Sequence, residues 1–531
     1  MQSVKRNIRA PMSKFLFSRS NILVVSAVFI FILVVVRTAW ISDDAYITFR
    51  TIDNWVQGYG LSWNVYDRVQ VYTHPLWMLL ISGFYFVTRE MYYTTIFASI
   101  VISSSAVALF AFGIARTKTL ACLGILLLLF SKAFIDYSTS GLENPLTHLI
   151  LGVFFYVYLR TESNYKSLLL LSVIGGLGML TRLDTSLLFM PVILHSLFLM
   201  HSRLKSTLII SLGLLPLLIW ETFSLLYYGF PMPNTAYAKL DVGISRIDLI
   251  PPGSYYFWNS IKWDSLTLIT IFVSLAIVFV TKDLRHRYVS LGVLFYLIYI
   301  LVIGGDFMSG RFFSGLLFMA VIILSTSRIH LTRNQTLVGA IGIVLIGSIS
   351  LNPPILSGAG YGTEKTDGGK TVSHLVADNH GIADERSFYY NASGLLNAKK
   401  GLKMPDSPMA EYGRLQQLKD RPAVTWSNIG FFGFFAGPQV YVIDRYAIAN
   451  PMLARLPITT HFINPITGTH WRIGHFPREL PDGYIESLES GENSSNDQEI
   501  SELYDRLQLI TRGNLLDRDR LKAIWRMNTG R

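Results

Sequence analysis

The chain has 531 residues, of which 51% are hydrophobic and only 15% are charged, and its formal net charge is +11. A soluble protein of this length carries more charge and fewer continuous apolar runs. The composition therefore excludes an ordinary soluble enzyme and predicts a polytopic α-helical membrane protein. The single cysteine, Cys122, excludes an intrachain disulfide and a cysteine metal site.

Long apolar runs predict the membrane spans. The clearest are residues 21–39, 208–227, 266–280, 288–303 and 337–351, and several more lie between 75 and 200. The runs suggest about twelve segments, but an inside start and an outside finish require an odd number. We therefore expect about eleven spans, with one short segment between 75 and 200 that does not cross.

Basic residues cluster beside these runs, which is typical of cytoplasmic loops and excludes a nucleic-acid partner. The clusters are Lys5, Arg6, Arg9, Lys14 and Arg19; residues 201–207; Lys282, Arg285 and Arg287; and Arg328 and Arg333. The N-terminus is therefore expected in the cytoplasm and residues 41–74 outside. Residues 229–264 are expected to form a second large outer loop.

The first outer loop contains two adjacent acids, Asp43 and Asp44, just beyond the first span. Carboxylates are costly beside a membrane unless they react or bind. Such a pair can accept a proton from a hydroxyl or hold a divalent cation against a phosphate. Apolar residues then recur at steps of three or four, which predicts an amphipathic helix along the bilayer surface that ends at Gly58 and Gly60.

After Pro353 and Pro354 the composition becomes mixed and no run could span a membrane. Residues 1–352 are therefore expected to form the transmembrane catalytic domain. Residues 353–531 are expected to form one soluble, mixed α/β domain outside the membrane. Within it, residues 439–444 alternate as a strand does, and residues 491–498 are typical of a solvated loop.

Several further polar residues lie next to predicted spans and could bind a lipid phosphate or a sugar. They are His74, Glu143, Arg182, Asp184, Asn234, Lys239, Asp306 and Arg311. Simpler interpretations exist for some of them. Arg182 and Asp184 could form an internal ion pair, Lys239 and Arg311 could be interfacial bases, and Glu143 could cap the following helix. The chain lacks a Gly-rich nucleotide-binding loop and a His-rich zinc motif, so nucleotide-driven chemistry is not expected.

These segments together resemble the GT-C superfamily of membrane glycosyltransferases, and in particular cell-wall arabinofuranosyltransferases that use decaprenyl-phosphate arabinose. The resemblance spans residues 40 to about 485. It rests on the ordered motifs DDAYITFR (43–50), GLSWN (60–64), YTHPLW (72–77), SGLE (140–143), TRLD (181–184), YGFPMPNTAYAK (228–239), GGDFMSGRF (304–312), VID (442–444), NPMLARLP (450–457) and RIGHFPR (472–478).

The resemblance implies a GT-C fold in the cytoplasmic (inner) membrane, with a periplasmic C-terminal domain that helps to bind the acceptor. It implies a catalytic acid at Asp43 or Asp44 and a polyprenyl-phosphate sugar donor used without a nucleotide. Arg472 and His475 fall in a matched segment, and His475 is expected either to reach the active site or to lie on the surface. The acceptor is expected to be a cell-envelope glycan or a pilin-like glycoprotein. A flippase for lipid-linked sugars is the main alternative, and an accessory subunit is a third.

Overall fold

The computed structural model describes residues 19–240, 242–281, 283–350, 353–361, 363–365, 371–373, 378–419, 423–459, 468–469 and 471–530. The basic residues Lys5, Arg6, Arg9, Lys14 and Lys282, which supported the predicted orientation, lie outside these ranges.

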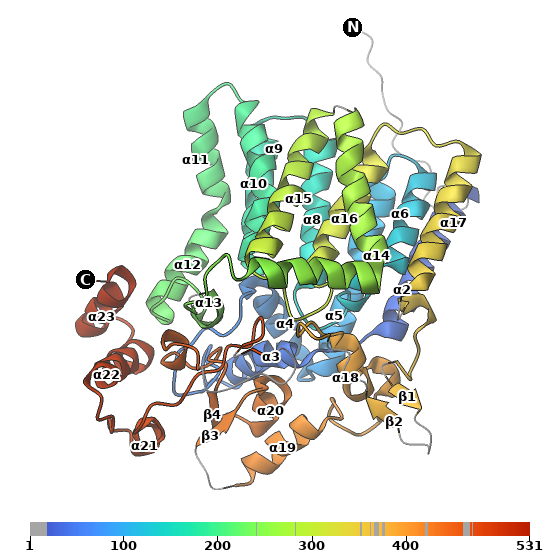
Figure 1. Cartoon of the computed structure of the whole chain (residues 1–531). Helices are drawn as coiled ribbons and strands as arrows, with labels where there is room; N and C mark the ends of the chain where they lie inside the picture. Colours follow the sequence, from blue (N-terminus) through green and yellow to red (C-terminus); the bar gives the residue numbers. More distant parts are fainter. Residues whose placement is uncertain are drawn as a thin grey trace.

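Most of the described chain is helical, and Figure 1 shows a bundle of long helices with a smaller, mixed region at one end. The bundle helices are α2 (Arg19–Thr38), α4 (Pro75–Thr88), α5 (Tyr92–Leu109) with the π-helical turn Phe110–Ile114, α6 (Lys118–Phe130), α8 (Asn144–Arg160), α9 (Tyr165–Thr181), α10 (Ser186–Phe198), α11 (Arg203–Gly213), α12 (Leu215–Tyr227), α14 (Ile250–Thr281), α15 (Leu284–Val302), α16 (Phe313–Thr326) and α17 (Arg333–Ile349).

The mixed region combines the first loop with the C-terminal part of the chain. Its helices are α3 (Asp43–Val56), α7 (Lys132–Asp136), α13 (Asn234–Leu240), α18 (Glu385–Ser393), α19 (Pro408–Gln417), α20 (Ile429–Ala436), α21 (Tyr484–Ser490), α22 (Gln498–Arg512) and α23 (Arg518–Thr529). Single 3₁₀ turns cover Leu183–Thr185, Pro354–Leu356, Leu395–Asn397 and Leu453–Arg455. Strands β1 (Thr363–Lys365) and β2 (Thr371–Ser373) pair antiparallel, whereas β3 (Ala423–Trp426) and β4 (Tyr441–Asp444) pair parallel.

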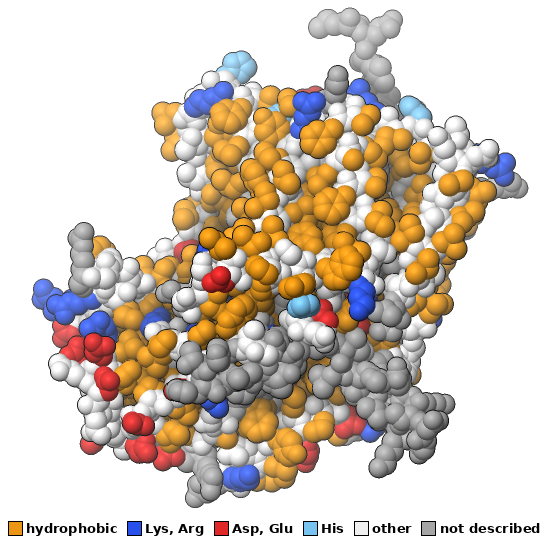
Figure 2. All heavy atoms as spheres, viewed as in Figure 1, with side chains coloured by type: hydrophobic (Ala, Val, Ile, Leu, Met, Phe, Trp, Pro, Cys, Tyr) orange, Lys and Arg blue, Asp and Glu red, His pale blue; other side chains and the backbone are white. Residues whose placement is uncertain are grey.

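The bundle has the surface of a membrane protein. Among the described residues, four helices are long and apolar enough to cross a bilayer, and the bent pair α11–α12 adds a fifth. Six further apolar helices are shorter, at 10–17 residues. Figure 2 shows hydrophobic side chains over the outside of the bundle, with acidic side chains gathered near the mixed region. The chain is therefore a helical membrane protein, while the count of about eleven spans stays a prediction.

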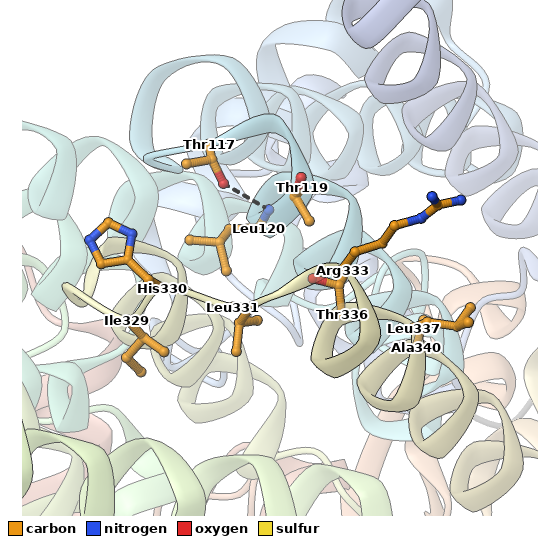
Figure 3. Close-up of a pocket in the computed structure, with 10 residues that line it drawn as sticks. All are labelled: Thr117, Thr119, Leu120, Ile329, His330, Leu331, Arg333, Thr336, Leu337 and Ala340. Carbon is orange, nitrogen blue, oxygen red and sulfur yellow. Dashed lines mark hydrogen bonds between the residues drawn. The ribbon is translucent and has the colours of Figure 1, made fainter.

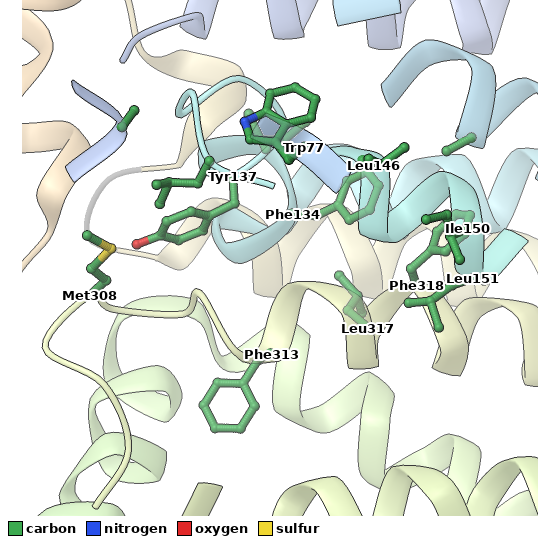
Figure 4. Packing of buried hydrophobic residues seen from close by; sticks show 14 of the residues in the cluster. Trp77, Phe134, Tyr137, Leu146, Ile150, Leu151, Met308, Phe313, Leu317 and Phe318 are labelled. Carbon is green, nitrogen blue, oxygen red and sulfur yellow. The ribbon is translucent and has the colours of Figure 1, made fainter. Parts of the chain in front are cut away.

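The core of the bundle is built around α16, which is apolar on every side. Residues Leu316–Ile323 of this helix are each at most 1% exposed, as expected for a helix surrounded by others. Figure 4 shows Phe318 of α16 close to Phe134, whose rings stack at 5.8 Å. In the same view Trp77 lies near the 137–146 segment, and its indole N–H donates to the carbonyl of Gly141 at 2.9 Å.

The segment predicted as the second outer loop, 229–264, contains helices. Much of it is helical, in α13 and in the first part of α14, which crosses below the bundle in Figure 1. The helix direction changes at Asp264, whose backbone (φ −154°, ψ 62°) is not helical. Its carboxylate accepts from the N–H of Ala133 at 2.8 Å and the hydroxyl of Thr267 at 2.6 Å, and these bonds fix the kink.

Helix α3 forms where the three- and four-residue spacing predicted it, and Gly58 and Gly60 follow it with φ of +93° and +90°. Its apolar face does not rest on the bilayer surface, however. The phenylalanine-rich helix α20 covers it, and the ring of Tyr46 packs 4.9 Å from Phe431 and 5.1 Å from Phe434. The first loop is therefore buried between the bundle and the C-terminal region.

Buried charges tie the C-terminal region to the bundle. Arg386 pairs with Asp136 at 2.9 Å, and Lys132 pairs with Asp384 at 2.9 Å. Strand β4 is also bound from the first loop, because the Asn64 side chain exchanges two hydrogen bonds, both 3.1 Å, with the backbone of Val442. The domain division at 352/353 stays a prediction. Residues of the first loop, 41–74, pack against the region C-terminal to this division.

Close contact between α20 and α3 depends on glycine. A methyl group at Gly430 would lie 1.9 Å from the carbonyl oxygen of Asp43. Gly430→Ala is therefore expected to push the helices apart and to destabilise the protein by about 1–3 kcal/mol. The measurement is the unfolding midpoint of the purified protein.

Gly342→Ala on α17 is the matched control, because nothing lies within 4 Å of the added methyl group. Its expected effect is neutral or stabilising by up to about 1 kcal/mol. Equal midpoints for Gly430→Ala and the native chain would contradict close packing of the two helices.

Candidate active site

Glu143 is the centre of a buried cluster of charged residues at the end of the bundle near α3. It stands at the N-cap of α8, but its side chain caps nothing there and is 0% exposed. Its carboxylate lies 2.9 Å from Arg182, 3.1 Å from Arg311 and 3.2 Å from Nδ1 of His74. Burial alone would raise the pKa of Glu143, but these neighbours outweigh it and hold the pKa well below its usual value.

Two further acids complete this cluster. Arg182 pairs with Asp184 through two hydrogen bonds of 3.0 and 2.5 Å, and the hydroxyl of Tyr296 donates to Asp184 at 3.0 Å. Asp306 lies 3.7 Å from Arg311. The predicted internal ion pair of Arg182 and Asp184 is thus present and belongs to a larger network. Six residues from four separate motifs meet at one place: His74, Glu143, Arg182, Asp184, Asp306 and Arg311.

His74 links this cluster to α3. Its Nε2 lies 2.9 Å from the hydroxyl of Thr48, and its Nδ1 faces Glu143. Burial lowers the pKa of His74 to about 4, and the charges of Arg311 and Arg182 contribute, against the opposing effect of Glu143. The imidazole is therefore neutral at pH 7, and its Nδ1 lies 3.2 Å from the Glu143 carboxylate without an aligned hydrogen bond.

This pKa predicts a loss of stability in acid. Between pH 6.5 and about pH 4 the unfolded chain binds a proton on His74 that the folded protein does not. Stability therefore falls as the pH falls through this window, by roughly 3 kcal/mol in total. The unfolding midpoint of the native chain should drop more steeply than that of His74→Asn, because asparagine has no proton to gain.

Other titrating groups, including Asp43, are common to both proteins and cancel in the difference. His330→Asn, at an exposed position on the opposite end of the bundle, should keep the native pH profile. Parallel profiles for the native chain and His74→Asn would contradict a neutral His74.

The two adjacent acids of the first loop differ sharply. The oxygens of Asp43 accept from the backbone N–H groups of Gly430 and Phe431, at 3.1 and 2.7 Å. Burial raises the pKa of Asp43 to about 7, against the opposing effect of the Phe431 N–H. Asp44 is partly exposed, and within the described ranges its side chain has no hydrogen-bond or ion-pair partner. Asp43 therefore anchors α20, and Asp44 is the free carboxylate.

Asp44 lies near the charged cluster. Burial lowers the pKa of Arg311, but the charges of Glu143, Asp306 and Asp44 raise it overall. Burial raises the pKa of Asp306, and Asp44 contributes in the same direction. The Asp44 carboxylate is thus close enough to the cluster for its charge to act on Arg311 and Asp306.

The ring of Phe307 brings three predicted residues beside this cluster. Lys239 Nζ and the Arg472 guanidinium lie 5.7 and 5.3 Å from its centroid, and the His475 ring meets it edge-on at 4.5 Å. His475 is half-buried, its ring also packs edge-on against Tyr446 at 4.9 Å, and burial lowers its pKa to about 3. Asn234 is structural, because its amide donates to the carbonyls of Ala447, Ile448 and Asn450.

Several donors in this area have no acceptor. In the described part of the chain, Arg311 Nε and Arg472 Nη2 are buried without a hydrogen-bond partner. Lys239 likewise has no carboxylate partner there. Buried donors are almost always satisfied, so the site has unused capacity for an anion such as a phosphate.

Glu385, the first residue of α18, was not predicted as a site residue. Its side chain is buried, and no hydrogen-bond partner is found for it among the described residues. Burial, followed by the charge of Asp44, raises the pKa of Glu385 well above its usual value. Its stretch of polar residues carries no apolar periodicity that would have revealed its burial.

A cation site at the predicted Asp43–Asp44 pair finds little geometric support. Both oxygens of Asp43 face backbone N–H groups, which leaves Asp44 as the available carboxylate of the pair. Within the described ranges, no group of three or more His, Cys, Asp or Glu side chains is arranged to hold a metal ion.

Figure 3 shows a pocket of about 610 Å³ at the end of the bundle opposite α3. It is lined by the starts of α6 and α17. His330 and Arg333 are its only charged or titratable lining residues in the described chain, and they point to opposite sides. Its described lining has no carboxylate and no ion pair, whereas Asp44 lies near a cluster of paired acidic and basic residues, so the cluster near Asp44 is the candidate active site.

Comparison with known proteins finds a similar enzyme, a glycosyltransferase. The chain is 24% identical over 530 aligned residues to the terminal β-(1→2)-arabinofuranosyltransferase of Mycobacterium tuberculosis (strain ATCC 25618 / H37Rv), covering 84% of this chain and 82% of that protein. No family model and no solved structure matches the chain, so the GT-C fold stays a prediction. The similarity and the apolar helices support a membrane glycosyltransferase that is distantly related to the mycobacterial protein.

Proposed function

We propose that the chain transfers a sugar, D-arabinofuranose, from a polyprenyl-phosphate donor to a glycan or glycoprotein acceptor on the outer face of the cytoplasmic membrane. The observation that carries the proposal is an unpaired carboxylate, Asp44, beside cationic donors that lack acceptors. The choice of a pentose rests on the name of the similar mycobacterial enzyme.

In this mechanism the acceptor hydroxyl oxygen attacks the anomeric carbon of the donor sugar. Asp44 takes the hydroxyl proton as general base. The bond between the anomeric carbon and the phosphate oxygen breaks, and its electron pair leaves with the polyprenyl phosphate. Arg311, Lys239 and Arg472 stabilise the charge that develops on this leaving group, because donors already in position cost little reorganisation during the reaction.

The test uses the purified full-length protein and synthetic polyprenyl-phosphate arabinofuranose, with released polyprenyl phosphate as the readout. Release that requires an acceptor oligosaccharide supports a transferase. Release with another lipid-phosphate sugar, but not with arabinose, would keep the chemistry and overturn the donor. Movement of lipid-linked sugar across vesicles without any acceptor would instead identify the flippase.

The same assay tests a role for a divalent cation. Mg²⁺ is commonly held by one or two carboxylates together with substrate phosphates, and Asp44 with the donor phosphate fits that pattern. If EDTA abolishes release and Mg²⁺ restores it, Asp44 is assigned to the cation. If EDTA has no effect, Asp44 is assigned to proton transfer.

A further inference from the structure

A second pocket, of about 630 Å³, lies at the end of the bundle opposite Asp44. It is formed where α8, α10, α15 and α16 end or begin, beside the segment before α6. Four arginines line it, against a single acid, Asp283. With its histidines neutral, the lining carries three net positive charges. The four arginines are Arg116, Arg160, Arg285 and Arg328.

Three of these arginines are held in place by backbone carbonyls. Arg285 donates to the carbonyl of Tyr158 at 3.1 Å, Arg160 to that of Ala115 at 3.2 Å, and Arg116 to that of Ser327 at 3.4 Å. Such contacts cap helix ends, which is an ordinary structural role. A guanidinium has five N–H donors. Arg285 also donates to Leu159, Thr161 and Ser163, whereas Arg116 makes a single such contact and keeps donors for a ligand.

Other groups in the pocket also lack partners. The exposed Arg328 side chain has no partner among the residues that the structure describes. His195 is 4% exposed, and its Nδ1 lies 2.8 Å from the hydroxyl of Tyr158. Its Nε2 has no partner in the described chain. In the tautomer in which Tyr158 donates to Nδ1, Nε2 carries a proton and presents one more donor to an anion.

The lining is apolar as well as basic. Leu199 and Leu284 line the pocket and are 47% and 53% exposed. A free phosphate has no use for apolar surface, whereas a phospholipid places acyl chains beside its headgroup. Basic pockets between spans on the cytoplasmic side bind anionic lipid headgroups, and the positive charge of the neighbouring loops predicts that this end faces the cytoplasm.

We propose that this pocket binds the phosphate headgroup of an anionic phospholipid from the inner leaflet. The headgroup contacts Arg116, Arg328 and His195, and the acyl chains lie against Leu199 and Leu284. The site is separate from the candidate active site and does not depend on the proposed function.

The test measures lipid retention by native mass spectrometry. Full-length protein is stripped in detergent and then mixed with phosphatidylglycerol or phosphatidylcholine. One phosphatidylglycerol is expected to stay bound, and phosphatidylcholine is not. The double variant Arg116→Gln/Arg328→Gln should weaken retention by about thirtyfold, about fivefold for each charge removed. Both positions are exposed, so folding should be unaffected.

Arg287→Gln is the control, because Arg287 is exposed near the start of α15, close to the lining residues Leu284 and Arg285, but does not line the pocket itself. It should retain the lipid as the native chain does. Millimolar inorganic phosphate is tested separately for protection of the protein against thermal unfolding. If it protects the native chain as well as phosphatidylglycerol does, and does not protect the double variant, the ligand is a free phosphate and the lipid proposal is overturned. Equal retention of both lipids, or equal losses in the double variant and the control, would overturn the proposal.

Discussion

Replacing Asp44 by asparagine is expected to slow sugar transfer by about 10²–10⁴-fold while leaving the unfolding midpoint close to that of the native chain. The size is that of losing a general base. Stability should not change, because the Asp44 side chain is partly exposed and has no partner among the described residues. The measurement is the turnover of polyprenyl-phosphate sugar at saturating donor and acceptor, alongside a thermal unfolding curve.

Asp43→Ala provides the contrast within the same dipeptide. It removes the acceptor for the N–H groups of Gly430 and Phe431, and an unsatisfied buried N–H costs about 1–3 kcal/mol. The expected result is a lower unfolding midpoint, with activity lost in proportion to the folded protein lost. If Asp44→Asn keeps full turnover while a stable Asp43→Ala has none, the two roles are exchanged.

Local patterns were enough to predict much of the bundle and the first loop. The apolar runs gave the long helices, because a lipid-facing helix must be apolar over its whole length. The three- and four-residue spacing gave α3, and Gly58 and Gly60 marked the end of the helical segment. Strand β4 also forms within the predicted 439–444 segment.

The partners of α3 could not be predicted, because they come from residues almost 400 positions away. Helix α20 is eight residues long and rich in phenylalanine, and such a short apolar run does not reveal what it covers. The difference between Asp43 and Asp44 has the same origin. Successive residues on a helix point in different directions. The position of α20 therefore decides which of the two carboxylates accepts hydrogen bonds from its backbone.

The remaining misses also follow from tertiary contacts. The helix before Asp264 was not predicted within the expected outer loop 229–264, because its polar residues and prolines weaken the helical pattern. The residues of the charged cluster could be selected from the sequence, because each of them stands beside a predicted span. Their meeting at Glu143 could be inferred only from shared outer placement, and the distances required the fold.

Glu143→Gln is expected to cost about 3–5 kcal/mol of stability, because removing one member of a buried ion network leaves the others uncompensated. Arg182 and Arg311 would share a neutral amide in place of a carboxylate that both contact within 3.1 Å. Glu221→Gln on α12 is the matched control. Glu221 is half-buried, and no ion pair is found for it in the described chain, so its replacement should be close to neutral.

A double-mutant cycle separates the network from a simple packing effect. Arg182→Gln should cost much less in the Glu143→Gln background than in the native chain, because its main counter-charge outside the Asp184 pair is already gone. Equal costs in both backgrounds would show that Glu143 and Arg182 do not stabilise each other. Glu143→Gln should also raise the donor KM, since Arg311 loses the carboxylate that holds it towards Asp44, whereas Glu221→Gln should leave KM unchanged. A Glu143 variant with reduced stability but native KM would confine Glu143 to folding and remove Arg311 from the phosphate site.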